Sequence, residues 1–547
     1  MGAFGKDGFF SICFMLISAA AGMGVLTVPW VFMQTGLGIG FGLLIYWGLL
    51  CSSTIYYLII GGLHYKVSNI TELVYYSILG EIKLDENSIE LEESFKTNQT
   101  RKRIAKNITF ALNVLILLDC LFFIPCLLIL LSDFLIPVNQ LVYRELPKLY
   151  QRYSNIKDSQ FLTFMYNTIL HVSLFFTNRN WCIIFFCIVV FLICLPNNFS
   201  GVRVASVLSV ISSLSTTTII VYCAIRPNHP LECSEYNNSD SYCRKGDIMV
   251  INHNSFNEIW RIMSVSNIIL FSHFCHFIVI PTTQNIRMSK KKIKLIVFAF
   301  SLAIFLFNGI VGTSGYSTFR LNTLPNIINN YTKDEPLIIL TRLYLVLSLT
   351  VTLCIETIPL VDSFTYTTKA ILSSTRQCFR KSIKAEEINP CKCPESTDYT
   401  TAEDDSVSNN YSSTLASTAN STPYIGIHCE KKTEINLEQE REEEESAKKK
   451  VRSRCVSKEK LQKIINFIVL LSFSGVMATS FGSVAKLIQV TGGTLDGVFI
   501  FLVPGWVYYS TYFRFSNKFF GTLLLAIYAI HFIVSAVSGI TELFRME

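Results

Sequence analysis

Residues 19–30 read AAAGMGVLTVPW, and they place Gly22, Gly24 and Pro29 inside an apolar run that extends from about residue 8 to residue 33. Glycine and proline interrupt helices, and in a bilayer every backbone group released by an interruption needs another partner. An unwound turn at mid-membrane depth exposes N–H groups that suit a carboxylate and carbonyls that suit a cation. Small residues also permit close helix packing, but glycine and proline together favour a broken helix that binds a ligand.

A second apolar run, FSHFCHFIVIP from Phe271 to Pro281, contains two ionisable residues. His273 and His276 are three residues apart, so they share one helix face. Ionisable groups inside a membrane are costly and usually face a cavity or a partner. The two imidazoles therefore either bind a ligand or relay protons, or they form neutral hydrogen bonds inside the bundle. No third ligand is spaced to complete a zinc site, and we predict no metal.

The composition is that of a membrane protein. Of 547 residues, 50% are hydrophobic and 16% are charged, whereas soluble chains carry about 25% charge. This excludes a disordered or nucleic-acid-coating protein. A membrane-spanning helix needs about 20 apolar residues. We therefore predict an all-α integral membrane protein with eleven transmembrane helices, at about 8–33, 36–62, 107–136, 181–197, 203–225, 260–283, 293–315, 336–360, 463–490, 496–513 and 519–541.

One further apolar segment is short. Residues 161–176 contain Asn167 and His171, and we predict an interfacial helix within a loop. A spanning helix here would move every later loop to the opposite side. The first run is too long, and too broken in its middle, to be a cleaved signal peptide.

The distribution of basic residues sets the topology, because loops rich in Lys and Arg remain cytoplasmic. Such residues gather at 101–106, at 287–294 and at both ends of 364–462. Eleven spans from a cytoplasmic N-terminus put all three on one side, and the C-terminus outside. The net charge of +7 then reflects topology, and no nucleic acid partner is predicted.

The predicted outside loops carry two kinds of modification signal. Cys233 and Cys243 flank a glycosylation sequon at Asn237, and an oxidising loop favours a disulfide between them. A second outside sequon begins at Asn330. We predict a glycoprotein with one disulfide bond.

The segment 364–462 separates the regions 1–363, with spans one to eight, and 463–547, with spans nine to eleven. It is rich in Ser, Thr and Asn and contains EQEREEEESAKKKVRSR, a block of acid followed by a block of base. This composition cannot bury enough apolar surface to fold alone, so we predict a disordered cytoplasmic loop. Its Ser and Thr residues could be phosphorylated, and its basic end could contact anionic lipid, so the loop is a candidate site for regulatory partners.

Several polar residues lie within the predicted spans. Asp119 and Glu356 are candidates for proton or cation coupling, or for pairing with a cationic group. Ser348, Thr350 and Thr352 place hydroxyls at alternating positions of the eighth span. Such hydroxyls ligate sodium or bond back to their own helix.

In their order along the chain, these motifs resemble the amino acid/auxin permease superfamily, most closely its sodium-coupled neutral amino acid transporter branch. AAAGMGVLTVPW resembles the first span of that family and SHFCHFIVIPTTQNIR its sixth. GTSGYSTFRLNTLPNIINNY is similar to the seventh span and the loop after it, and RLYLVLSLTVTLCIETIPLVDSF to the eighth. The cysteine pair between spans five and six also fits that branch.

The resemblance implies a five-plus-five inverted repeat like that of bacterial leucine transporters, with broken helices 1 and 6 and the last span outside the repeats. The substrate carboxylate would then meet the backbone at Gly22, Met23, Gly24 and Val25. The break in span six would complete the pocket through Ser272, His273, Cys275 and His276.

The resemblance leaves the coupling ion open. Where the sodium-coupled branch has an asparagine, this chain has Ser18, and its partner hydroxyl would be Thr350 or Thr352. Other branches use protons, for which Asp119, Glu356 and His276 are candidates. No cofactor beyond the coupling ion is implied.

The predicted function is therefore secondary active transport of amino acids across a lipid bilayer by alternating access, coupled to sodium or protons. The plasma membrane is favoured, with a vacuolar or lysosomal membrane as the alternative. The rival function is an amino-acid-sensing receptor on the same fold, signalling through the long loop. An enzyme is disfavoured, because no HExxH, GxSxG or GxxxxGK motif occurs in the spans.

Overall fold

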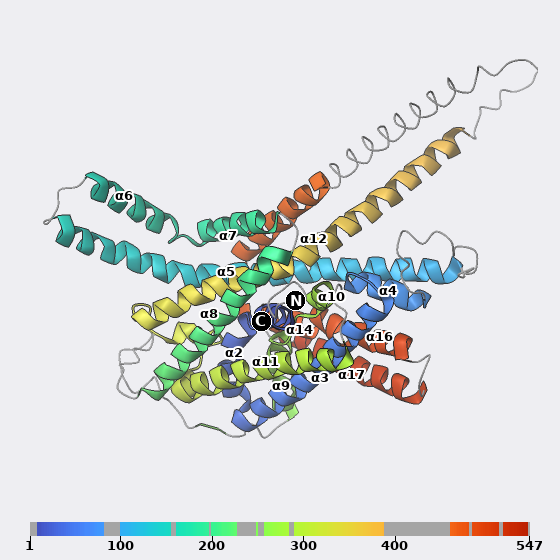
Figure 1. Ribbon diagram of the computed structural model, residues 1–547, viewed down its shortest axis with the longest axis horizontal. Helices are drawn as coiled ribbons and strands as arrows, with labels where there is room; N and C mark the ends of the chain where they lie inside the picture. The colour runs from blue at the N-terminus through green and yellow to red at the C-terminus, as the bar shows by residue number, and fades with distance from the viewer. Residues whose placement is uncertain are drawn as a thin grey trace, which may run out of the picture. The chain divides into compact units, whose positions relative to one another are not determined.

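The computed structural model describes residues 8–80, 99–154, 160–195, 199–226, 248–249, 256–283, 289–387, 460–480, 484–512 and 518–544, and the regular elements in these ranges are all helical (Figure 1). The chain divides into one unit of residues 1–368 and 463–547 and a second of 369–462. In the second unit, the described residues 369–387 and 460–462 are helical.

Within the described ranges, nine helices are long and apolar enough to cross a membrane, or up to eleven crossings if each of two bent helix pairs is one span. This supports the predicted integral membrane protein. The unbent elements are α3 (Leu37–Tyr65), α5 (Gln99–Ser154), α8 (Phe199–Ile225), α11 (Lys290–Phe319), α12 (Pro336–Glu387), the helix Lys460–Ser480 and α17 (Lys518–Phe544). The short elements α4 (Ile70–Leu79), η3 (Arg320–Asn322) and η4 (Ile327–Asn330) lie between spans.

Two spans consist of several shorter elements. The sixth joins α9 (Phe256–Phe271) to α10 (His276–Thr283). The tenth joins α14 (Val484–Gly493), α15 (Leu495–Gly497), the π-helical turn η5 (Val498–Leu502) and α16 (Val503–Tyr512). π-Helical turns of this kind are frequent at functional sites.

The two bent pairs contain the first span and the predicted interfacial helix. Helices α1 (Phe9–Ala20) and α2 (Met23–Thr35) meet at 54°. Helices α6 (Gln160–Phe175) and α7 (Arg179–Cys194) meet at 101°, and the Asn178 side chain caps α7 by accepting from Asn180 N at 2.9 Å. A bend near a right angle is compatible with α6 lying along the interface while α7 crosses.

Two predicted boundaries were wrong. Helix α12 continues to Glu387, although the polar loop was predicted to begin at residue 364, because residues 360–387 contain no glycine or proline to end the helix. The ninth span ends by Ser480, and residues 484–493 begin the tenth span. Hydropathy continues from one span into the next, so it did not separate them.

Helix α11 holds the first span in place. It packs against α2 and α3 (Figure 1). A Cβ at Gly312 would lie 2.8 Å from Val28 Cγ1, and one at Gly315 would lie 2.7 Å from Pro29 Cγ. The two glycines therefore let α11 approach α2 more closely than any larger residue would.

The loop between α11 and α12 is tied down by buried polar groups. Asn330 is 7% exposed, its Nδ2 donates to Asn322 O at 2.8 Å, and its Oδ1 accepts from Leu324 N at 2.9 Å. Buried Arg342 donates through Nη2 to Ile328 O at 3.2 Å. The Asn330 amide is therefore engaged within the folded loop, and glycosylation at this residue stays a prediction.

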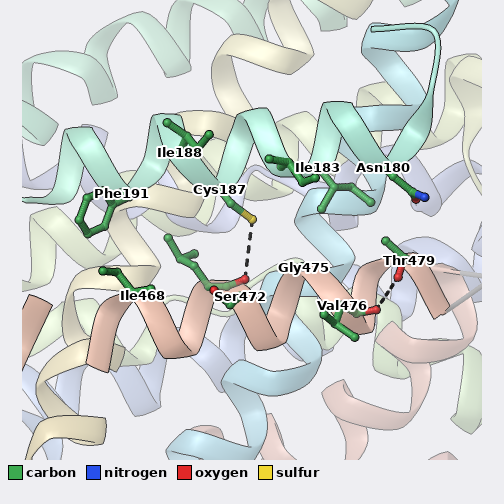
Figure 2. Close-up of a pocket in the computed structure, with 12 residues that line it drawn as sticks. Asn180, Ile183, Cys187, Ile188, Phe191, Ile468, Ser472, Gly475, Val476 and Thr479 are labelled. Atoms are coloured by element: carbon green, nitrogen blue, oxygen red, sulfur yellow. Dashed lines mark hydrogen bonds between the residues drawn. The ribbon is translucent and has the colours of Figure 1, made fainter. Parts of the chain in front are cut away.

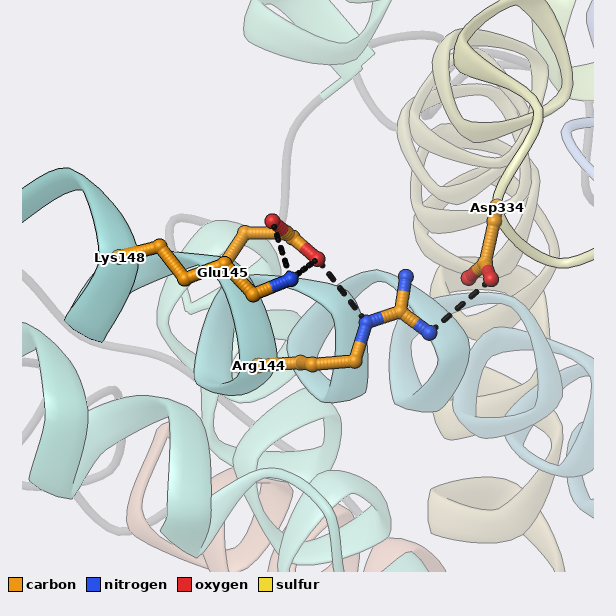
Figure 3. A network of polar contacts seen from close by, with 4 residues as sticks. All are labelled: Arg144, Glu145, Lys148 and Asp334. Atoms are coloured by element: carbon orange, nitrogen blue, oxygen red, sulfur yellow. Dashed lines mark hydrogen bonds and ion pairs between the residues drawn. The ribbon is translucent and has the colours of Figure 1, made fainter.

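An exposed network joins the same loop to α5. Arg144 contacts Asp334 Oδ2 at 3.0 Å and Glu145 Oε1 at 3.1 Å, and Lys148 also contacts Glu145 (Figure 3). These side chains are 40–63% exposed. Exposed pairs contribute only about 0–1 kcal/mol each, so this network adds little to stability.

Candidate functional site

The break in the first span leaves an uncapped helix N-terminus inside the bundle. Only Ala21 and Gly22 are non-helical, and α2 begins at Met23. No side chain caps α2, and its first turn contains no acidic residue. The first four N–H groups of a helix lack intrahelical partners, so the backbone at Met23, Gly24 and Val25 is a ready anion site. The predicted unwound segment was thus too long, since three of its four residues are helical.

The break in the sixth span covers Ser272 to Cys275. Ser272 is held from two sides: its Oγ donates to Ile269 O at 2.7 Å and accepts from Asn308 Nδ2 of α11 at 2.9 Å. All four residues of the break are buried. The last turn of α9 therefore ends in a fixed geometry beside α11.

The two breaks face each other directly. A Cβ on Gly24 would lie 2.4 Å from Ser272 Cβ and 2.6 Å from Ser272 Cα. Helix α2 packs against α9, and α1 against α10. The predicted substrate residues of spans one and six are thus brought together, with Gly24 against the backbone of Ser272.

The histidines of span six point toward α3. His276 Nε2 lies 2.9 Å from Thr54 Oγ1, which itself donates to Cys51 O at 2.9 Å. His273 Nδ1 lies 2.8 Å from Ile269 O, and its Nε2, which has no partner among the described residues, lies 3.5 Å from a Cβ built on Gly48. The two imidazoles therefore pack between the sixth-span break and α3.

A chain of hydroxyl groups joins α1, α8 and α12. Ser18 Oγ donates to Ser209 Oγ at 2.8 Å, and Ser209 Oγ lies 2.9 Å from Ser348 Oγ. Thr352 Oγ1 donates to the Ser18 carbonyl at 2.7 Å. The predicted pairing of Ser18 with span eight is thus made by Thr352. Thr350 bonds back to Val346 O at 2.7 Å and does not join this cluster.

Three buried carboxyl groups form a second polar cluster. Asp119 of α5, Glu356 of α12 and Asp496 of α15 are each at most 1% exposed. The carboxyl groups of Asp119 and Asp496 lie within hydrogen-bonding reach of each other, and Glu356 lies close enough to interact with both. No described residue hydrogen-bonds to Asp119 Oδ1, to Glu356 Oε1 or to either oxygen of Asp496.

Asp496 was missed by sequence reasoning. It is the first residue of the predicted tenth span, 496–513, whereas in the structure that span already includes the end of α14. The signal was present in TGGTLDG, residues 491–497, where glycines interrupt a helix around an acid.

Among the described residues, no group of three or more His, Cys, Asp or Glu side chains could hold a metal ion. Cys233, Cys243 and Asn237 lie outside the described residues, so the disulfide and the first glycosylation site stay predictions.

Comparison with known protein families identifies the family of this chain. The family model described as "Transmembrane amino acid transporter protein" matches residues 5–544.

The chain belongs to the transmembrane amino acid transporter family.

The match confirms the predicted amino acid/auxin permease superfamily. In this member of the transmembrane amino acid transporter family, the two facing breaks place a helix N-terminus of span one against the end of a helix of span six. Helix N-termini favour carboxylates, and the carbonyls at the ends of α1 and α9 favour an ammonium group. The family is one of amino acid transporters.

Proposed function

We propose that this chain is a secondary active transporter that carries amino acids by alternating access, with the substrate between the breaks of spans one and six. The observation that carries the proposal is the uncapped N-terminus of α2 facing the sixth-span break. The substrate carboxylate accepts hydrogen bonds from the backbone at Met23, Gly24 and Val25. Its ammonium group lies toward the carbonyls at the ends of α1 and α9.

The same contacts support a five-plus-five inverted repeat. Each half of the first span packs against the opposite half of the sixth, α1 against α10 and α2 against α9. Two broken helices related by a two-fold axis in the membrane plane make such reciprocal contacts. We place the N-terminus in the cytoplasm and the C-terminus outside, because the loops rich in Lys and Arg then lie on the cytoplasmic side. We place the protein in the plasma membrane, which the glycosylation sequons and the cysteine pair in the predicted outside loops favour.

For the coupling ion we propose a proton, held between Asp119 and Asp496. Two ionised carboxylates only accept hydrogen bonds, so neither can donate to the other. Adjacent carboxyl groups away from water cannot both stay ionised and share one proton instead. Glu356 and Cys126 are the other titratable groups near the pair, and no described basic side chain forms an ion pair with it. Binding of a proton to this pair would favour one position of the tenth span, and release of the proton would favour another.

The runner-up coupling ion is sodium, at the hydroxyl cluster of Ser18, Ser209, Ser348 and Thr352. Hydroxyl and carbonyl oxygens suit a hard cation, and Thr352 already reaches the Ser18 carbonyl. The cluster is uncharged, however, and its hydroxyls bond to one another. The buried carboxyl groups therefore favour the proton.

The variant Thr352→Val distinguishes proton coupling from sodium coupling. With proton coupling, uptake by the wild type is equal in sodium and choline buffers, and the variant loses about fivefold, because a hydrogen bond contributes about 1 kcal/mol. Thr350→Val, on the same helix, is the matched control. Sodium stimulation of the wild type that disappears in Thr352→Val alone would replace the proton proposal by the sodium site.

The transport function itself is tested with purified protein in liposomes. We expect saturable uptake of a radiolabelled amino acid and competition by a subset of unlabelled amino acids. Competition should require both the α-carboxylate and the α-amine, because each contacts a different half-helix. Specific binding without uptake would favour the sensing receptor.

A further inference from the structure

An open groove runs between α3 and α11, and none of the proposed substrate-binding or coupling residues lines it. Its volume is about 490 Å³, within the roughly 300–1,000 Å³ typical of ligand sites. Ile45 and Leu49 of α3 and Phe298 and Leu302 of α11 line it, and each of these side chains is 44–69% exposed. We call it the α3–α11 groove. In a bilayer, exposed apolar side chains of spans face lipid.

One end of the α3–α11 groove is charged. Lys294 lines it, together with Tyr56 and Tyr57. Lys294 is exposed and forms no ion pair with any residue that the structure describes. Exposed Lys290 and Lys291 precede it at the start of α11. In the proposed topology, this end of the groove lies at the cytoplasmic face.

A second groove provides an internal comparison. It lies between α7 and the helix Lys460–Ser480, has a volume of about 520 Å³, and is lined from Phe191 and Ile468 to Asn180 and Thr479 (Figure 2). Its polar end is neutral, with an amide and a hydroxyl but no basic lining residue. The two grooves are thus similar in size and apolar walls but differ in the charge at one end.

We propose that the α3–α11 groove binds an anionic phospholipid, with its acyl chains on the apolar wall and its phosphate at Lys294. The charge supports this occupant, because an unpaired ammonium at the cytoplasmic interface attracts headgroups with a net negative charge more strongly than zwitterionic headgroups, whose own cation offsets the phosphate. Tyr56 also lines the groove, and a tyrosine hydroxyl can donate a hydrogen bond to a phosphate oxygen. This site is independent of the proposed substrate and of the coupling ion.

The test is lipid retention by the purified full-length protein. Native mass spectrometry would count phosphatidylserine and phosphatidylcholine bound to the wild type, Lys294→Gln and Lys290→Gln. We expect Lys294→Gln to lower phosphatidylserine binding about fivefold, since one lysine near the surface contributes about 1 kcal/mol, and to leave phosphatidylcholine binding unchanged. Lys290→Gln removes the same charge from the same helix end without lining the groove, so it should stay within about twofold of the wild type.

Three results would overturn the proposal. Equal losses in Lys290→Gln and Lys294→Gln would mean diffuse attraction to a basic surface. Equal retention of both lipids by the wild type would mean that the groove takes neutral lipid. Unchanged retention by Lys294→Gln would place the bound lipid elsewhere. Since Lys294 is exposed, none of these outcomes depends on a variant that fails to fold.

Discussion

Amino acid uptake falls to background in Gly24→Val, while the amount of protein at the cell surface stays near that of the wild type. A Cβ at this position would lie 2.6 Å from Ser272 Cα and 3.0 Å from Ser272 N. Backbone cannot rotate away as a flexible side chain can, so α2 and α9 must separate. A displacement of about 1 Å at a site that positions its ligand costs about a hundredfold in rate. Uptake normalised to surface biotinylation measures the effect.

The control for this prediction is Gly42→Val in α3, where a Cβ would meet nothing within 4 Å, and uptake should be retained. A second comparison adds Ser272→Gly to Gly24→Val. Because the clash includes the backbone of Ser272, removing its side chain should not restore uptake. Transport at the wild-type rate in Gly24→Val would refute the site between the two breaks.

Asp496→Asn should abolish acceleration of uptake by an inward proton gradient. An asparagine has the shape of an aspartate but can neither take up nor release a proton. The wild type, in liposomes at about pH 5.5 outside and about pH 7.5 inside, should concentrate the substrate, since each pH unit supplies about tenfold per coupled proton. In the variant the ratio of uptake with and without the gradient should fall to about one.

Folding failure is separated from uncoupling by substrate exchange. Asp496→Asn should still exchange labelled for unlabelled amino acid across the membrane, because exchange needs the substrate site but no net proton movement. Asp362→Asn is the matched control: Asp362 is 49% exposed and paired with Lys463 at 2.7 Å, and its loss should leave the gradient effect intact. Undiminished stimulation in Asp496→Asn would remove the carboxyl pair from the mechanism.

Much of the architecture could be predicted from local sequence. Apolar runs of about 20 residues follow from bilayer thickness alone, and Gly22 and Gly24 mark the break of span one. The break of span six at Ser272 was implied by the family resemblance. The family match over residues 5–544 confirms the class that these motifs indicated. Boundaries were less certain, because hydropathy does not show where α12 ends or where the ninth span gives way to the tenth.

The partners of each polar residue could not be predicted, since they depend on how helices rotate against one another. Thr350 and Thr352 look equivalent in the sequence, yet only Thr352 reaches Ser18. Ser209 was not singled out, although it links Ser18 to Ser348. Asp496 is more than 370 residues from Asp119 in the chain, and only the packing of α15 against α5 brings them together.

The most direct measurement is an experimental structure of the protein with a bound amino acid, by cryo-electron microscopy in a lipid nanodisc. We predict its carboxylate within about 3 Å of the backbone nitrogens in the first turn of α2, at Met23, Gly24 and Val25, with the ammonium group toward the ends of α1 and α9. A ligand that contacts neither break, with Gly24 still packed on Ser272, would contradict the proposed transport site.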